Sequence, residues 1–334
     1  MKVAGVGAGY FAQFHYAAWA AMHGVSLVGA CDHDKARATA TGARAFTDLG
    51  DMLAQTQPDI LDIITPPEGH AECIRAGLAA GVRAIICQKP FCTSLDEAKA
   101  MTDAATAAGI PLIIHENFRF QPWYRAAKWM IDEGEIGTPH QLTFRLRTGD
   151  GQGPSAYLDR QPYFQTMPRL LIHETGVHWV DVFRYLFGRP TAVYADLRRL
   201  NPAIKGEDAG LVIFEFEGGK RAVFDGNRLL DHAAENHRMT LGEGLFEGSA
   251  GTLQLTGDGA LHLRKFGQTQ QVAALPARDY DGFGGDCVAK LQRHVVMGLR
   301  DGAPFENEAA DYLFVREVEE AIYRSAETGA RVTL

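Results

Sequence analysis

Short apolar runs alternate with longer amphipathic stretches along the first 115 residues. The apolar runs lie at 2–6, 26–30, 60–65, 83–87 and 112–115, and stretches with helical spacing lie at 12–23, 34–43, 69–80 and 95–108. Runs this short suit buried strands, and the stretches between them suit helices. Repeated strand and helix units of this length predict a parallel, doubly wound α/β sheet, in which ligands bind beyond the carboxyl ends of the strands.

The pattern changes from about residue 120. Runs in which apolar and polar residues alternate lie at 141–147, 192–198, 210–216 and 221–225, with shorter segments from 239 to 263. Such alternation predicts strands with one buried face, and EGGK at 217–220 predicts a hairpin turn. Helical patterns lie at 122–133, 168–188, 284–300 and 308–326.

These two patterns predict two domains. We expect an α/β domain at 1–119 and an α+β domain at 120–334, the second built on a large, mainly antiparallel open sheet. Helices can cover one face of that sheet. We expect the other face to join copies of the chain into a homodimer or homotetramer.

Composition narrows the kinds of partner. The 334 residues exceed the size at which a single core keeps growing, which agrees with two domains. A net charge of -8 without a Lys/Arg-rich run argues against nucleic acid or a membrane and favours a small molecule. We find no signal-peptide pattern and no apolar run of about 20 residues, so we expect a cytoplasmic protein. The five cysteines form no Cys-x-x-Cys pair, which favours reduced thiols.

A glycine-rich turn follows the first apolar run. Residues 7–12, GAGYFA, match the pattern G-x-G-x-x-A. Its first glycine permits a tight turn, its second lets the backbone approach a pyrophosphate, and its small last residue allows close helix packing. The motif alone is weak evidence, but its place between a strand and a helix predicts a dinucleotide site. We expect that site to include Gly7, Gly9, Tyr10, Phe11 and Ala12.

An acidic residue ends the second predicted strand. Asp32 lies about 20 residues beyond the glycine turn, where a carboxylate can accept hydrogen bonds from the adenosine ribose. Its charge would repel a 2′-phosphate, so we expect NAD rather than NADP, although Lys35 and Arg37 are close enough in sequence to bind a phosphate. The competing interpretation, a helix cap, fits Asp34 better than Asp32.

Further candidates stand where the other strands of the first half end. They are Thr65, Pro66, Pro67, His70, Gln88, Lys89 and Asn117. Lys89 precedes a proline, which favours extended backbone and presents its side chain from a constrained turn. A lysine is usually a solvated surface group, but at this edge of the sheet a site role is favoured. We expect these residues to line the cofactor site.

The helical pattern at 168–188 carries ionisable residues on an otherwise apolar helix. Glu174, His178 and Asp181 stand at i, i+4 and i+7, so a regular α-helix projects them from one face. In one interpretation Glu174 and His178 form a structural ion pair and Asp181 caps a neighbouring element. In the other, these residues are catalytic. The cofactor motifs favour catalysis for Glu174 and His178 and leave Asp181 as a structural partner. His173 and His178 are five residues apart, whereas a zinc helix places its histidines four apart. We therefore expect no catalytic metal.

Together these motifs resemble one known family. The glycine turn, Asp32, TPP at 65–67, QKP at 88–90, NFRF at 117–120, the E-x-x-x-H-x-x-D helix and AIYRSA at 321–326 are similar to the Gfo/Idh/MocA (glucose-fructose oxidoreductase / inositol dehydrogenase) family. The likeness covers essentially the whole chain. It implies a Rossmann domain, an open-sheet substrate domain and nicotinamide-dependent oxidation of a sugar or polyol hydroxyl. Within the family, the motifs look most like the D-apiose dehydrogenase branch, which implies oxidation of an aldose to a lactone.

The resemblance also implies roles for single residues. Lys89 corresponds to the lysine of the family's Glu-Lys-Pro motif, and Glu174 and His178 to the acidic residue and histidine of its Asp-x-x-x-His motif. Gln88 stands in place of the glutamate, and Glu174 is one methylene longer than the aspartate. The implied mechanism has His178 as base and Lys89 stabilising the alkoxide, or the two roles exchanged, with Glu174 orienting them. Weaker candidates for substrate contacts are Asn117, Arg147, Tyr163 and Arg169.

Two other functions stay open at this point. One is an NAD-using glycosidase or lyase, in which a sugar carbon is oxidised and reduced again without net redox. The other is a non-enzymatic sugar or nucleotide sensor built on the same fold. A sensor would have no need of both Lys89 and His178, which argues against it.

Overall fold

The computed structural model describes residues 1–334, which form two compact units. The first unit holds residues 1–117 and 288–316, and the second holds 118–287 and 317–334. Helix α8 (Phe283–Asp301) and helix α9 (Ala309–Thr328) therefore each begin in one unit and end in the other. The predicted domains 1–119 and 120–334 place 288–316 with the second half. By its contacts this segment belongs to the first unit, where Ile113 pairs with Glu308.

The first unit is built on a parallel sheet, as predicted. Its six strands run in the order β3-β2-β1-β4-β5-β6, and all neighbours are parallel. The strands are β1 (Lys2–Val6), β2 (Ser26–Cys31), β3 (Ala45–Phe46), β4 (Ile60–Ile63), β5 (Ala84–Gln88) and β6 (Leu112–His115). The helices between them are α1 (Ala12–Ala20), α2 (Lys35–Ala40), α3 (Leu49–Thr56), α4 (His70–Ala80) and α5 (Leu95–Ala108). The short β3 and α3 lie outside the apolar runs and helical stretches predicted from the sequence.

The second unit is built on the predicted large open sheet. Its nine strands run in the order β14-β13-β12-β11-β7-β10-β9-β8-β15. They are β7 (Pro139–Leu146), β8 (Pro190–Arg198), β9 (Ala209–Phe216), β10 (Arg221–Asn227), β11 (Gly242–Gly248), β12 (Gly251–Leu255), β13 (Leu261–Lys265), β14 (Val272–Leu275) and β15 (Val332–Thr333). All neighbours are antiparallel except β7 and β10. The 217–220 hairpin joins β9 to β10 as expected.

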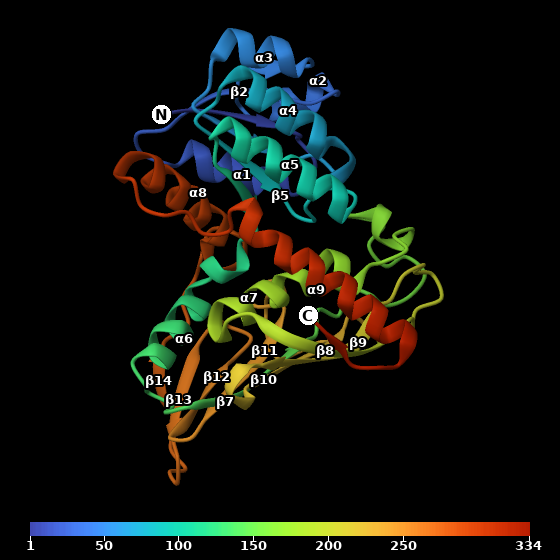
Figure 1. The fold of residues 1–334 in the computed structure, drawn as a ribbon, viewed down its shortest axis with the longest axis vertical. Helices are drawn as coiled ribbons and strands as arrows, with labels where there is room; N and C mark the ends of the chain where they lie inside the picture. The colour runs from blue at the N-terminus through green and yellow to red at the C-terminus, as the bar shows by residue number, and fades with distance from the viewer. The chain divides into compact units, whose positions relative to one another are not determined.

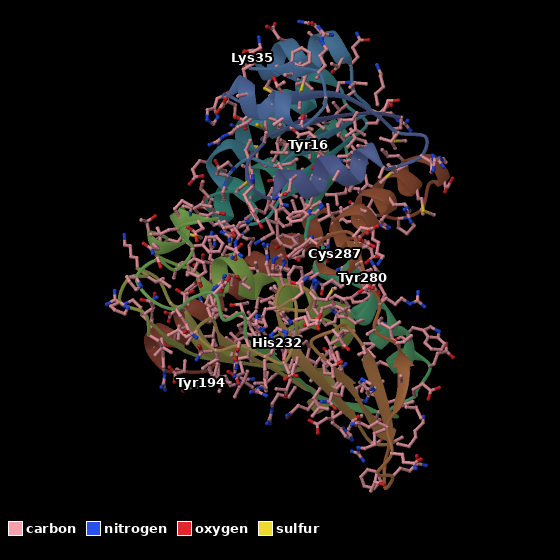
Figure 2. All side chains as sticks on the ribbon, turned by 180° about the vertical axis from the view of Figure 1, so that it is seen from behind. Tyr16, Lys35, Tyr194, His232, Tyr280 and Cys287 are labelled. Carbon is pink, nitrogen blue, oxygen red and sulfur yellow. The ribbon has the colours of Figure 1, made fainter.

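Only one face of this second sheet is covered by helices. Figure 1 shows α7 (Val177–Phe187) against one face and no helix on the other. On the covered face Trp179 of α7 packs on Phe144 and Phe224, with ring centroids 4.3 and 5.4 Å apart. On the other face Tyr194 of β8 keeps 40% of its surface exposed (Figure 2). No helix of the chain is long and apolar enough to span a membrane.

The helix predicted at 168–188 is not regular throughout. Residues Leu171–Gly176 form a π-helical turn, and α7 continues from Val177. The wide turn is held from outside the helix. Glu207 accepts hydrogen bonds from the backbone N–H groups of Leu171 (2.9 Å) and Ile172 (3.1 Å), and the Tyr323 hydroxyl accepts from His173 N (3.1 Å). Acceptors supplied by distant residues thus bind the first N–H groups of the turn. Because Glu174 lies in the π-helical turn and His178 in α7, the two side chains are not spaced as in a regular α-helix.

Candidate active site

The glycine turn of the first unit has the shape that a bound dinucleotide requires. Gly7 has a φ of +95°, and a Cβ there would lie 2.7 Å from the backbone of Ile64. A Cβ on Gly9 would meet nothing within 4 Å, so this glycine borders open space rather than protein. The Tyr16 hydroxyl, inside the unit, donates to the carbonyl of Gly7 (3.2 Å; Figure 2). Gly7 thus serves the fold, while Gly9 leaves room for phosphates.

The carboxylate of Asp32 is tied to this turn. Its Oδ2 accepts a hydrogen bond from Ala8 N (2.7 Å), and its Oδ1 accepts from Asp34 N (2.9 Å). Asp34 caps α2 by accepting from Ala36 N (2.8 Å), so the cap interpretation applies to Asp34. Asp32 is left with oxygen lone pairs for a ribose.

Asn117 offers a further group for a ligand. Its side chain is 2% exposed, and its Nδ2 is buried without a hydrogen-bond partner. A buried donor of this kind costs about 1–3 kcal/mol when left unsatisfied. The amide therefore fits a polar group of a bound molecule. Tyr10 is 38% exposed and Phe11 packs on Phe14, with centroids 5.3 Å apart.

His70 holds two loops together rather than facing solvent. Its Nε2 bonds to the carbonyl of Thr65 (3.0 Å), and its Nδ1 accepts from Cys92 N (3.3 Å). Burial lowers the pKa of this ring to about 4, although the Thr65 carbonyl acts in the opposite direction. His70 thereby connects the turn that contains Pro66 and Pro67 to the segment after Lys89. Its expected place among the cofactor contacts is indirect, because both ring nitrogens are used by the backbone.

Lys89 stands at the end of β5, half-buried. Its backbone N–H donates to Oε1 of Gln88 (2.9 Å), and the bond from Lys89 to Pro90 is cis. The other end of the Gln88 amide lies 2.9 Å from Nε2 of His15. Gln88 is thus engaged inside the first unit and only 7% exposed.

His178 of the second unit is held by the short helix η2 (Phe118–Phe120). Its ring stacks on Phe118 with centroids 3.7 Å apart and an interplanar angle of 2°. One turn further along α7, Asp181 accepts hydrogen bonds from Arg119 (2.8 and 2.6 Å) and Arg184 (2.9 Å). Burial raises the pKa of Asp181, but the two guanidinium groups outweigh it and hold that pKa below its ordinary value. Phe118 and Arg119 of the NFRF motif therefore hold the histidine-bearing helix, and the Asp181 carboxylate is engaged by two arginines.

Glu174 is held by a buried arginine. Its Oε2 accepts a hydrogen bond from the Thr175 hydroxyl (2.5 Å) and lies 3.8 Å from Nη1 of Arg228. Arg228, 4% exposed, also donates to Thr175 (2.6 Å) and to the Tyr157 hydroxyl (2.7 Å), and pairs with Asp150 at 3.4 Å. Burial alone would lower the pKa of Arg228, but Asp150, Tyr157 and Glu174 raise it above its ordinary value. This cation stays charged and keeps the carboxylate in place.

The remaining candidates for substrate contacts differ in their surroundings. Tyr163 is 54% exposed, and burial of its hydroxyl together with the charge of Glu174 raises its pKa to about 12. Arg169 pairs with Glu320 (2.8 Å) and lies over the Tyr323 ring. Arg147 is committed to the sheet, because it donates to the carbonyl and carboxylate of Asp225 (2.7 and 2.6 Å). The effect of Glu174 on the pKa of Tyr163 places these two side chains near each other.

Sequence patterns missed several supporting residues. Thr175 and Arg228 hold Glu174, and Phe118 stacks on His178, yet none belongs to a periodic pattern. Phe118 could have been found through its place in NFRF, but Arg228 follows an ordinary strand and gives no local signal. No group of three or more His, Cys, Asp or Glu side chains is arranged to hold a metal ion.

A six-stranded parallel sheet with this glycine turn and Asp32 defines a dinucleotide-binding protein of the Rossmann class. The family models place it more narrowly. Residues 1–115 match the model described as oxidoreductase family, NAD-binding Rossmann fold, and residues 124–252 match the GFO/IDH/MocA C-terminal domain. The chain belongs to the Gfo/Idh/MocA oxidoreductase family and is an NAD-binding oxidoreductase, which confirms the predicted family and cofactor.

Known proteins are similar along the full chain. A D-apiose dehydrogenase from Paraburkholderia graminis is 34% identical over 100% of this chain and 89% of its own length. A D-apiose dehydrogenase from Rhizobium rhizogenes is 30% identical over 100% of this chain and 97% of its own. A solved oxidoreductase from Agrobacterium radiobacter, in complex with NAD+, L-tartaric acid and magnesium, has a TM-score of 0.90 and 29% identity, covering 100% of this chain and 98% of that one.

Proposed function

We propose that this protein is an NAD-dependent sugar dehydrogenase that oxidises an aldose, with D-apiose as the first substrate to test, to a lactone. One observation carries the sugar assignment. Glu174 is a fixed carboxylate, held by Thr175 and Arg228, with 19% of its side chain exposed. Such a carboxylate can accept hydrogen bonds from the neighbouring hydroxyls that a sugar presents. The full-length similarity to two D-apiose dehydrogenases supports the choice of aldose.

In the proposed reaction, Lys89 and His178 act on the same substrate hydroxyl. The bound NAD supplies the hydride acceptor. His178, whose ring is immobilised by Phe118, removes the hydroxyl proton, and the ammonium of Lys89 stabilises the developing alkoxide. The two roles can be exchanged between them. Asn117 and Tyr163 are proposed as further substrate contacts.

The preference for NAD over NADP rests on Asp32. Its carboxylate is anchored to the glycine turn by Ala8 N and Asp34 N, so it cannot easily move away from a 2′-phosphate. The negative charges of the Asp32 carboxylate and of a 2′-phosphate beside it would repel each other. Arg37, the nearest arginine that follows, lies 3.6 Å from Asp34, which offsets its charge.

The uncovered face of the second sheet is proposed as the contact between copies of this chain. Strand register places Tyr194, Ile213, Val223, Thr143 and Leu245 in one row across five strands. Tyr194 and Leu245 are 40% and 36% exposed. An apolar row that runs across a sheet suits a self-complementary dimer or tetramer contact. Light scattering of a Leu245→Glu variant would test this contact.

The five free cysteines support a reducing compartment, so we place the enzyme in the cytoplasm.

A histidine pair on one helical segment gives the decisive test of the reaction. NADH formation at 340 nm is followed with D-apiose, other aldoses, inositols and sugar acids, using NAD and NADP in parallel. His178→Asn is expected to lose about 100-fold to 10,000-fold in kcat, with NAD affinity unchanged. The matched control is His173→Asn, because His173 bonds to Glu319 (2.6 Å). Near-normal turnover in His178→Asn, or glycoside cleavage without net NADH, would contradict the proposal.

A further inference from the structure

Three buried side chains of the first unit form a chain of hydrogen bonds that ends at Lys89. Asp62 of β4 and His15 of α1 are fully buried, and Gln88 ends β5. Oδ2 of Asp62 lies 2.8 Å from Nδ1 of His15, and Nε2 of His15 lies 2.9 Å from Nε2 of Gln88. Oε1 of Gln88 accepts a hydrogen bond from the backbone N–H of Lys89 at 2.9 Å. Figure 1 shows α1 and β5, which carry two of these residues, in the same unit.

The direction of every bond in this chain is fixed by one backbone group. A peptide N–H can only donate, so the atom of Gln88 that faces Lys89 N must be the carbonyl oxygen. The Gln88 NH2 group therefore faces His15 and donates to its Nε2. Since Nε2 must then be an acceptor, the ring proton of a neutral His15 lies on Nδ1 and is donated to Asp62.

Surrounding groups agree with this direction. Trp19 Nε1 is a donor only, and it donates to the same Oδ2 of Asp62 at 2.7 Å. Gln292 Nε2 lies 3.5 Å from this oxygen. Oδ2 of Asp62 therefore accepts from several donors, while Oδ1 is buried without a hydrogen-bond partner. The second hydrogen of the Gln88 NH2 group points to Nδ1 of His115 at 3.4 Å.

We infer that Asp62, His15 and Gln88 are positioning residues for Lys89, and that the neutral amide of Gln88 sets the His15 tautomer by donating a hydrogen bond to Nε2. The inference rests on the proposed role of Lys89 in the reaction. The relay also joins α1, which follows the cofactor turn, to the strand end that carries Lys89. A glutamate at 88, as in the motif that the chain resembles, would set a carboxylate oxygen against the bare Nε2.

The variant Gln88→Glu exposes this dependence. With two acceptor oxygens at residue 88, one still receives Lys89 N–H, and the other must find a proton on His15 Nε2. His15 is then expected to become an imidazolium, since each of its N–H groups would meet a carboxylate. The added charge at residue 88 and the charged His15 ring change the surroundings of Lys89, and kcat/KM is expected to fall by on the order of tenfold to a hundredfold.

Histidine ¹H–¹⁵N correlation spectra of the full-length protein test the relay directly. The His15 signal is assigned by its loss in His15→Asn. Wild-type protein at pH 7 is expected to show a neutral ring protonated on Nδ1, and Gln88→Glu a doubly protonated ring. The control is Gln55→Glu, which adds the same charge on the exposed side of α3, where the side chain of residue 55 accepts a hydrogen bond from Arg44 and can still do so as a glutamate, and which should keep the wild-type spectrum and kcat/KM.

The outcomes separate this inference from the proposed function. A wild-type His15 protonated on Nε2 overturns the relay. Unchanged kcat/KM in a folded Gln88→Glu overturns the positioning role. If Lys89→Met abolishes NADH formation while the His15 spectrum contradicts the relay, the proposed role of Lys89 in sugar oxidation is supported and the relay is wrong. If the spectra agree but Lys89→Met keeps full activity, the proposed role of Lys89 fails although the relay exists.

Discussion

The buried ring of His70 should make the stability of the protein depend on pH. Its pKa is about 4 in the folded chain, against an ordinary value of 6.5, because burial disfavours the charged ring. A group whose folded pKa is lowered stabilises the fold above its unfolded pKa, and this contribution is lost as the pH falls through the window between the two values. The window here runs from about pH 6.5 down to pH 4. The difference of about 2.5 pH units corresponds to about 3 kcal/mol at 1.36 kcal/mol per unit.

The variant His70→Gln isolates this effect. A glutamine can still donate to Thr65 O and accept from Cys92 N, but it does not titrate. Urea unfolding is measured at steps from pH 7.5 to pH 4 for both proteins, and their difference in unfolding free energy removes the contributions of all other groups. We expect the variant to be less stable at pH 7.5 by about 1 kcal/mol and to gain about 3 kcal/mol on the wild type by pH 4. A difference that stays constant across this range would refute the reasoning.

Two further predictions concern the glycine turn and the buried arginine pair. Gly9→Ala should leave the unfolding free energy within about 0.5 kcal/mol but weaken NAD binding at least about tenfold by calorimetry, because its Cβ enters open space that the phosphates need. Gly7→Ala is the contrasting variant: its φ of +95° and the 2.7 Å approach to Ile64 should cost more than about 1 kcal/mol of stability, and equal stability in the two variants would contradict this assignment. Asp181→Asn should lose about 3–5 kcal/mol in chemical denaturation because Arg119 and Arg184 stay buried without their carboxylate; a loss below about 1 kcal/mol would disprove the role of this pair.

Local patterns predicted the fold well, since each element is recognised by residues close together in sequence. Short apolar runs located β1, β2, β4, β5 and β6, and alternation located β7 to β10 within a few residues. Helix α5 begins one residue after Ser94, whose hydroxyl accepts a hydrogen bond from Glu97 N at 3.1 Å. The assignment of 288–316 by position along the chain differed from the contacts of this segment. Contacts such as that of Gln292 with His15 O (3.3 Å) leave no periodic trace.

The site was only partly predictable for the same reason. Motifs marked Gly9, Asp32, Lys89 and His178 as candidates, because their neighbours in sequence are informative. The groups that orient them come from far along the chain: Asp62 and His15 reach Lys89 through Gln88, and Arg228 reaches Glu174 across 54 residues of sequence. Arg147 shows a contact that its sequence pattern did not predict. Its Nη1 and Nη2 atoms donate to Asp225, while its Nε is buried without a hydrogen-bond partner.

The position of Arg228 beside the π-helical turn gives a physical reason for the glutamate at 174. Because Glu207 and Tyr323 hold the first N–H groups of the turn, Glu174 sits in a wider turn than His178, and the two side chains are fixed by different neighbours. The Glu174 carboxylate only just approaches Arg228, at 3.8 Å. An aspartate is shorter by one C–C bond of about 1.5 Å and would draw its carboxylate back from this cation. The longer side chain therefore suits the arginine at 228, in the same way that glutamine at 88 suits the tautomer of His15.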